Sequence, residues 1–367
     1  MADPRMQKLA DILVNYSTKV KPGDWVMVWS NTVALPLARE VYRSVLRAGG
    51  NPTMRLADDD LNEVFMTEAS DEQLQWLSPV TQATVSNVNA MIRLKAAHNT
   101  RVLMGVNPEK SRTYQAARRE LMEIYHQRVA SKELRWVATQ FPCQAHAQEA
   151  DMSLHEYEEF IYHATYADQP DPVARWQAVH DQQQHWVDWL KGKREVRVQG
   201  PNADLTLSIV ERSFVNSDGM NNMPSGEIFT SPVEDSTNGW IRFTYPAVRM
   251  GRAVEGVSLE FKDGKVVSAS AEKNTEYLNT MLDSDDGARF LGEFAIGTNY
   301  AIQRFTKNTL FDEKIGGTIH LALGSGFPEA GGVNKSTLHW DMVCDMRQDS
   351  TIHVDGELFY KDGQFQV

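Results

Sequence analysis

Apolar residues in the first half of the chain alternate between helical and strand-like spacing. Apolar residues three or four positions apart predict helices over residues 6–16, 34–48 and 109–130. Short apolar runs predict strands over residues 25–29, 53–56, 90–94 and 134–139. Strands that alternate with helices are typical of an α/β layer with a largely parallel sheet.

A helical pattern continues over residues 153–193, and the pattern changes after it. The expected apolar stripe of this segment comprises Trp176, Val179, Trp186, Trp189 and Leu190. Short strand-like segments follow at 196–198, 205–209, 240–245, 257–261, 266–269, 319–323, 338–343, 352–354 and 358–360. Asp-Gly pairs at 263–264, 355–356 and 362–363 lie between such segments and predict antiparallel hairpins. We therefore expect two domains, an α/β domain over residues 1–194 and a β-rich α+β domain over residues 195–367.

Length, charge and cysteine content narrow the class of protein. A chain of 367 residues is long enough for about two domains. Its 37 Lys and Arg residues against 49 Asp and Glu residues argue against a nucleic-acid partner and against an anionic membrane partner. Two cysteines, Cys143 and Cys344, fit a reducing compartment. With no apolar run of about 18 residues and no signal-peptide pattern, we expect a cytoplasmic protein.

A histidine and an aspartate at strand spacing mark the first candidate site. His339 and Asp341 lie in a strand-like segment, where residues i and i+2 point to the same face about 7 Å apart. An imidazole beside a carboxylate on a rigid strand provides half of a metal site. The alternative is an ordinary His–Asp hydrogen bond on a surface strand.

Further candidates lie among apolar or small residues. His320 shares its expected strand face with Ala322 and Gly324, which leave room for an ion, although a core histidine is an equally good interpretation. Glu227 and Glu293 each stand between glycine and apolar residues, where a buried acid needs a partner. Glu313 is weaker, because it lies in a polar segment where a solvated acid is the ordinary case.

Together these residues favour a carboxylate–imidazole metal site within residues 227–341. Such a donor set, without cysteine, suits zinc, cobalt, manganese or iron. The chain has no Gly-x-Ser-x-Gly motif, no phosphate-binding loop motif, and no Gly-x-Gly-x-x-Gly after a strand of the first domain. These absences disfavour a serine hydrolase, a nucleotide hydrolase and a dehydrogenase.

Six segments resemble one known family, the thermophilic metalloaminopeptidases of the aminopeptidase T and S type. They are KLADILVNYSTKVKPGDWVMV, FIYHATYADQPDPVARW, NMPSGEIFTSPVEDSTNGWIRF, FLGEFAIGTN, LFDEKIGGTIHLALGSGFPEAGGVN and STLHWDM, which span nearly the whole chain. The resemblance implies an α/β N-terminal domain, a C-terminal domain that holds two divalent metal ions, and a homodimer. The ions would be zinc, cobalt, manganese or magnesium.

The resemblance also implies roles for individual residues. The family's metal ligands fall on Glu227, Glu293, His320, His339 and Asp341. A further acid falls on Glu313, although its distance to the following histidine differs between branches of the family. We expect Glu293 to be the catalytic base. The chain departs from the family at residues 326–329, where Phe327 replaces a tyrosine thought to assist catalysis. Loss of one hydrogen-bond donor to a developing oxyanion typically costs about 10²–10³ in rate.

Three functional hypotheses follow. The first is an aminopeptidase that hydrolyses peptides with a water activated by two metal ions. The second is a ring-cleaving dioxygenase of the same superfamily, with one iron ion bound by His320, His339 and Asp341. Against it, a site with one ion does not need both Glu227 and Glu293. The third is a catalytically impaired member of the family, as Phe327 would suggest.

Overall fold

The structure, a computed structural model, describes residues 3–249 and 251–367. The chain forms two compact units. The first comprises the residues up to Arg175 together with Gly219–Pro224, and the second comprises Trp176–Asp218 and Ser225–Val367.

A parallel sheet forms the centre of the first unit. Its strand order is β2-β1-β3-β4-β8, and every pairing between neighbours is parallel. The strands are β1 (Trp25–Asn31), β2 (Asn51–Ala57), β3 (Ala90–Lys95), β4 (Arg135–Gln140) and β8 (Asn222–Met223). The predicted α/β class with a largely parallel sheet is confirmed.

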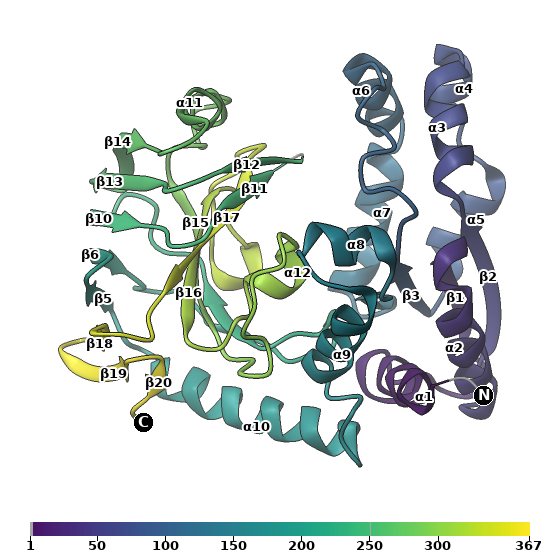
Figure 1. Cartoon of the computed structure of the whole chain (residues 1–367), viewed down its shortest axis with the longest axis horizontal. Coiled ribbons are helices and arrows are strands. Elements are labelled where there is room, and N and C mark those ends of the chain that lie inside the picture. Colours follow the sequence, from purple (N-terminus) through teal and green to yellow (C-terminus); the bar gives the residue numbers. More distant parts are fainter. Residues whose placement is uncertain (1–2, 250) are drawn as a thin grey trace. The chain divides into compact units, whose positions relative to one another are not determined.

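Helices connect these strands (Figure 1). They are α1 (Pro4–Asp11), η1 (Ile12–Ser17), η2 (Thr32–Ala34), α2 (Leu35–Arg47), α3 (Asp59–Glu68), α4 (Asp71–Gln75), α5 (Pro79–Asn87), α6 (Pro108–Ala116), α7 (Arg119–Ala130), α8 (Gln144–Glu149) and α9 (Leu154–Ala164). The prediction of a single helix over residues 109–130 is wrong, because α6 and α7 are separate helices. The amide of Arg118 bonds to the carbonyl of Gln115, an i+3 bond that ends the regular α-helical ladder.

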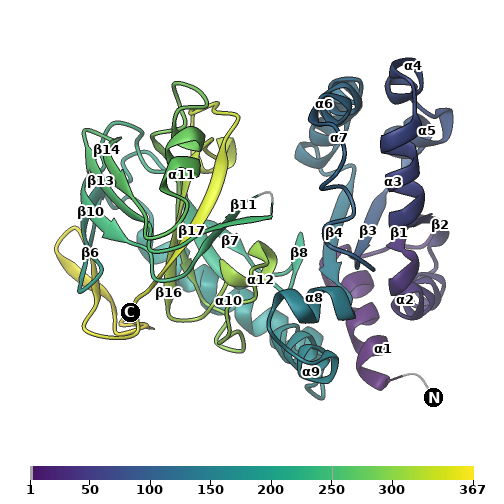
Figure 2. The same ribbon diagram turned by 45° about the horizontal axis from the view of Figure 1, so that its top comes forward.

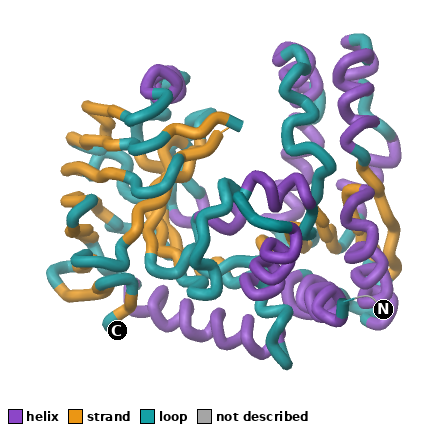
Figure 3. Tube along the Cα trace, in the orientation of Figure 1, coloured by secondary structure: helices purple, strands orange, loops and turns teal. Residues whose placement is uncertain are grey.

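The second unit consists largely of strands (Figure 3). They pair antiparallel, as the short apolar segments and Asp-Gly turns of the sequence predict. Its main strands are β5 (Glu195–Gly200), β6 (Ala203–Ser208), β7 (Val215–Ser217), β9 (Glu227–Thr230), β10 (Asn238–Arg242), β13 (Ser258–Lys262), β14 (Lys265–Ser270), β15 (Leu291–Gly297), β16 (Thr318–Gly324), β17 (His339–Asp345), β18 (Thr351–Val354), β19 (Glu357–Lys361) and β20 (Gln364–Phe365). A small ribbon pairs β11 (Ala247–Arg249) with β12 (Arg252–Val254). The helices are α10 (Pro172–Leu190), α11 (Thr275–Leu282), α12 (Thr309–Asp312) and η3 (Pro328–Ala330).

Two sheets of this unit share one apolar core. The larger sheet has the order β14-β13-β10-β6-β5-β18-β19-β20, and the other has the order β17-β16-β15-β9-β7 (Figure 2). Leu205 and Ile241 of the larger sheet belong to the same buried cluster as Ile296 and Leu321 of the smaller one. One face of the smaller sheet is therefore committed to the core, and only its other face is available for a polar site.

The three Asp-Gly pairs form the predicted hairpin turns. Asp263-Gly264 joins β13 to β14, Asp355-Gly356 joins β18 to β19, and Asp362-Gly363 joins β19 to β20. Both residues of each pair have a positive φ. This is the conformation of a type I′ turn, whose twist matches that of the strands it connects.

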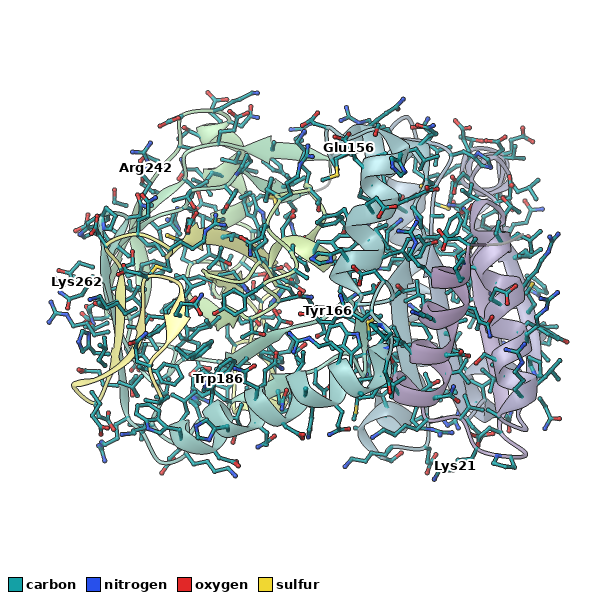
Figure 4. All side chains as sticks on the ribbon, turned by 60° about the horizontal axis from the view of Figure 1, so that its bottom comes forward. Lys21, Glu156, Tyr166, Trp186, Arg242 and Lys262 are labelled. Carbon is teal, nitrogen blue, oxygen red and sulfur yellow. The ribbon has the colours of Figure 1, made fainter. Side chains whose placement is uncertain are left out.

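Helix α10 packs with the second unit along most of its length. Trp186, Val187 and Leu190 belong to the apolar cluster of that unit, and Trp186 (labelled in Figure 4) stacks on Phe365 with 3.5 Å between ring centroids. The structural division therefore differs from the sequence-based limits of 1–194 and 195–367 by about the length of α10. The tryptophan stripe of α10 serves packing. A helical pattern predicts such an apolar face, but it does not show against which unit the helix packs.

Among the described residues, none of the helices combines the length and the apolar character that crossing a membrane requires.

Candidate metal centre

The smaller sheet brings the predicted ligands to one face. Glu293 on β15 and Asp341 on β17 both lie opposite Ala322 of β16, one on each side. Directly paired residues of an antiparallel sheet point to the same face. His320 lies two residues before Ala322 on β16, so its side chain is on this face as well.

The remaining strand residues complete the same face. Glu227, the first residue of β9, lies opposite Gly297 of β15, and His339, the first residue of β17, lies opposite Gly324 of β16. The neighbours of the predicted ligands on β15 and β16 are thus alanine or glycine. Such small side chains leave the space above the sheet to the acids and imidazoles.

The other face of these strands is apolar and buried. Phe294, Leu321 and Met342 occupy alternate positions and belong to the core cluster. A register shift between Leu291 and Glu293 marks a β-bulge at Gly292. Because of that extra residue, Leu291 also faces the core while Glu293 faces the polar site.

The acids and imidazoles lie slightly too far apart for hydrogen bonds. His320 Nε2 is 3.5 Å from Glu293 Oε1 and 3.7 Å from Glu227 Oε2. His339 Nε2 is 3.4 Å from Glu293 Oε2 and 3.5 Å from Asp341 Oδ1. Hydrogen bonds are about 2.7–3.2 Å long, whereas two ligand atoms that each lie about 2.1 Å from one ion are about 3–3.5 Å apart. The spacing therefore suits ions between these groups.

Several of these polar atoms are buried without a hydrogen-bond partner among the residues that the structure describes. They include Glu227 Oε2, both ring nitrogens of His320 and Asp341 Oδ1. A buried polar atom without a partner is costly, unless it is bound to a group such as a metal ion. Oxygen and imidazole nitrogen donors suit divalent cations, so the residues present fit the metal that the sequence predicts.

Two overlapping groups of ligand atoms are close enough to hold an ion each. One consists of Glu293, His339 and Asp341, and the other of Glu313, His320 and Asp341. Within each group the ligand atoms lie within 4.8 Å of one another, and Asp341 belongs to both. Glu227 lies beside the second group through its approach to His320. All six residues of the predicted set are thus brought together.

The ring of His339 is oriented by a backbone carbonyl. Its Nδ1 lies 3.0 Å from the carbonyl oxygen of Ser325. A carbonyl can only accept, so Nδ1 carries the hydrogen and donates it. In the neutral ring the lone pair is then on Nε2, which faces Glu293 and Asp341. Metal-binding histidines are commonly held in this way.

Burial and charge act in opposite directions on the pKa values of this cluster. Burial lowers the pKa of His339, but Asp341 and Glu293 outweigh it and raise this pKa to about 11. Burial likewise lowers the pKa of His320, and Glu293 and Glu227 raise it to about 9. Burial raises the pKa of Glu293, yet its two histidine neighbours hold that pKa below the ordinary value. The cluster therefore attracts cations strongly, and a metal ion would compete with protons for the same atoms.

Lys314 is a member of the cluster that is absent from the predicted set. Its side chain is fully buried, and its Nζ is 3.5 Å from Glu227 Oε1 and also contacts Glu313. Glu313 follows α12 directly and is largely buried rather than solvated. Burial raises the pKa of Glu313 to about 8 even though Lys314 lowers it. In the sequence Lys314 directly follows Asp312 and Glu313, where a solvated lysine is the ordinary expectation.

Phe327 lies against the cluster with no polar atom to offer. Its ring meets that of His339 edge-on at 5.2 Å and that of Phe229 at 4.9 Å. The backbone amide of Phe327 donates to Ser231 Oγ, which itself donates to the carbonyl of Gly292. The loop is thus attached to the strand that carries Glu293, and the ring has a defined position.

A small pocket opens beside the cluster. Glu313 and Asp341 form part of its lining, and apolar side chains, including those of Val248, Phe305 and Val343, form much of the rest. Asp312 and Lys307 line it as well, so three acids and one lysine border the apolar wall of this recess.

A parallel α/β unit together with an antiparallel unit that carries a buried carboxylate–imidazole cluster is the architecture of a metal-dependent enzyme. The chain belongs to the thermophilic metalloprotease family (M29), whose family model matches residues 2–365.

Relatives of known activity cover almost the whole chain. Aminopeptidase 2 of Geobacillus stearothermophilus is 27% identical over 401 residues, which cover 99% of this chain and 95% of that protein. Aminopeptidase T of Thermus thermophilus is 26% identical over 396 residues, which cover 98% of this chain and 95% of that protein. The predictions of this family and of a metalloaminopeptidase are confirmed by these matches.

Solved structures share the fold. The wild-type AmpT structure from Thermus thermophilus superposes with a TM-score of 0.84 at 23% identity and covers 99% of both chains. A 2,5-dihydroxypyridine dioxygenase from Pseudomonas putida KT2440 superposes with a TM-score of 0.57 at 12% identity, over 98% of this chain and 96% of that one. The first supports the two-domain fold class closely, and the second shows that a related fold occurs in another class of enzyme.

Asp285 anchors the segment that leads into β17. Its Oδ2 accepts from the amide and hydroxyl of Thr337, at 2.8 and 2.7 Å, and its Oδ1 accepts from the hydroxyl of Ser336 at 2.7 Å. These hydrogen bonds, those from Thr337 first, lower the pKa of Asp285 to about 2. Thr337, which is bound to Asp285, lies two residues before His339, so these hydrogen bonds contribute to the position of His339.

We predict that Asp285→Asn lowers stability at neutral pH and that the loss fades in acid. The folded pKa of about 2 is below the unfolded value of about 3.9, so the stabilisation is complete above about pH 4 and is lost as pH falls toward 2. Urea unfolding of both proteins between pH 7 and pH 3 measures the difference. Asp286→Asn, at an exposed neighbour, is the control, and a difference that does not shrink in acid contradicts the assignment.

Proposed function

We propose that this chain is an aminopeptidase that removes the N-terminal residue of peptides with a water activated by two divalent ions. The observation that carries the proposal is the pair of overlapping ligand groups that share Asp341 on one face of the sheet. Membership of the metalloprotease family and the aminopeptidase activity of the relatives support it.

The proposed ligands fall into two sets. Glu293, His339 and Asp341 would hold one ion, and Glu313, His320 and Asp341 the other, with Glu227 beside His320. We propose zinc, cobalt, manganese or magnesium as the metal. When bound, such ions polarise a carbonyl oxygen and lower the pKa of a water molecule.

Glu293 is the proposed general base. Its pKa lies below the ordinary value because of His320 and His339, so the carboxylate is ionised at neutral pH. Its two oxygens face the two histidines, one toward each ligand group. A carboxylate in that position can take a proton from the attacking water and deliver it to the leaving amine.

The pocket beside Glu313 and Asp341 supports action at a free N-terminus. Glu313 and Asp341 line this pocket, so a free N-terminal amino group in its neutral form could bind an ion held by these two acids. The apolar wall formed by Val248, Phe305 and Val343 suits the side chain that follows the amino group. An internal peptide bond has no free amino group to place there.

We predict that Glu293→Gln lowers kcat by about 10²–10⁴-fold, the usual contribution of a general base. The amide is close in size to the carboxylate, so the circular dichroism spectrum is expected to remain that of the wild type. Hydrolysis of aminoacyl substrates and metal content are measured together, since Glu293 is also a proposed ligand. Glu260→Gln, at an exposed acid on β13, is the matched control. A variant with wild-type kcat would show that Glu293 is not the base.

The alternative is a dioxygenase with a single iron ion bound by His320, His339 and Asp341. The shared fold with the dihydroxypyridine enzyme is the observation that favours it. Glu293 and Glu313 argue for the peptidase, because each completes one of two ligand groups and a single iron needs neither.

Metal content separates these two functions. We expect about two divalent ions per chain after dialysis against zinc, cobalt or manganese, and hydrolysis of aminoacyl substrates that is lost with a chelator and restored by metal. Elemental analysis of the purified chain measures the ratio. One iron per chain, with oxygen consumption on a dihydroxypyridine, would support the dioxygenase instead.

Phe327 allows a test of the catalytically impaired alternative. Phe327→Tyr would place a hydroxyl beside His339, and we expect kcat to rise, by up to about 10²-fold if no other donor serves the oxyanion. Phe229→Tyr is the matched control, because it adds the same atom to the neighbouring ring. Equal kcat for both variants and the wild type would mean that the missing hydroxyl does not limit the reaction.

A homodimer and a cytoplasmic location are further proposals. The family resemblance supports the dimer, and the N-terminal unit exposes large apolar side chains, including Leu61, Trp76 and Val80, that a second copy would cover. The two buried free cysteines suit a reducing compartment. Light scattering of the purified protein measures the oligomeric state.

A further inference from the structure

Lys314 is a buried cation inside a cluster of acids. Its side chain has no exposed surface, and among the described residues its ion pairs are with Glu227 and Glu313. A buried ammonium is strongly destabilising unless charged groups compensate it. Two carboxylates in direct contact with the ammonium provide that compensation.

The backbone delivers Lys314 to this place. The amide of Lys314 donates to the carbonyl of Phe311, and its carbonyl accepts from the amide of Asn299. Gly297, which lies opposite Glu227, has no side chain, and a Cβ there would collide with the backbone of Ile315. The chain around Lys314 therefore lies close against β15, which brings the ammonium to Glu227.

The position of Lys314 is not symmetric with respect to the two ligand groups. It contacts Glu313 of one group, whereas no ion pair within the described residues links it to Glu293 or Asp341. A divalent ion held by Glu313, His320 and Asp341 would therefore have an ammonium as a close neighbour. Two like charges that are partly removed from water repel each other.

We propose that Lys314 is a positioning residue that acts as a built-in counter-cation. It holds Glu227 and Glu313 together when no metal is bound, and it weakens the binding of the ion on the Glu313 side. The two ions consequently bind with unequal affinity, one tightly at Glu293, His339 and Asp341 and the other more loosely. The inequality rests on the proposed two-ion function, whereas the role in the metal-free protein does not.

The test is Lys314→Met in the full chain, with Lys262→Met as control. Lys262 is exposed on β13 and is seen at the outer edge of its unit in Figure 4, so the control changes net charge equally. After treatment with a chelator, we expect Lys314→Met to melt about 10 °C below the control, because Glu227 and Glu313 are left buried without their partner. Addition of zinc should recover most of this loss.

Calorimetric titration with zinc tests the second part. In the wild type we expect two binding events that differ by about tenfold or more in affinity. In Lys314→Met the weaker event should strengthen by about tenfold, while the tighter event changes by less than about threefold. This part of the proposal is overturned if Lys314→Met loses the weaker binding event. It is also overturned if the weaker event has the same affinity in Lys314→Met as in the control, Lys262→Met.

A second variant covers the case in which Lys314→Met does not fold. Lys314→Met with Glu313→Gln removes the ammonium together with one of the two acids that it contacts, and it should recover most of the melting temperature of the metal-free protein. No recovery would mean that Lys314 serves packing alone, which overturns the proposal. A single binding event in the wild type would contradict the two-ion function, and the metal-free melting temperatures would still decide the role of Lys314.

Discussion

The arrangement of the C-terminal unit depends on the cost of burying acids and imidazoles on one face of a sheet. Glu227, Glu293, Glu313 and Asp341 share a small volume with His320 and His339, and several of their polar atoms have no hydrogen-bond partner within the described part of the chain. Isolated charges in such a place would be prohibitive. The apolar core on the opposite face of the same strands provides the stability that offsets this cost, since Leu321, Phe294 and Met342 alternate with the site residues.

Much of this arrangement can be predicted from local spacing. The i, i+2 relation of His339 and Asp341 and the small residues near His320 both lead to the observed face of the sheet. The Asp-Gly turns follow from their preference for positive φ. The family resemblance adds Glu227 and Glu293, which composition alone marks only as embedded acids. Their convergence is a property of the tertiary structure, because β9 and β15 lie far apart in the sequence.

Other features could not be predicted from local spacing. Lys314 follows an acid and precedes an isoleucine and two glycines, and no periodic pattern tells a buried lysine from a solvated one. Its burial depends on the close approach of its backbone to Gly297, a contact between distant segments. The division of residues 109–130 into α6 and α7 and the membership of α10 in the second unit depend likewise on which surface each helix meets.

The bulge at Gly292 has a consequence for the tolerance of β15 to change. Alternate residues of a regular strand face the same side, so Leu291 and Glu293 would share one face. The extra residue at the bulge instead places Leu291 on the apolar core and Glu293 on the polar site. The residue at the bulge is itself constrained, because a Cβ at position 292 would collide with the backbone of Ser325. A bulge that straightened without losing a residue would turn Leu291 and Glu293 to the same side of the sheet, whereas deletion of Gly292 would leave a regular strand with the two still on opposite sides.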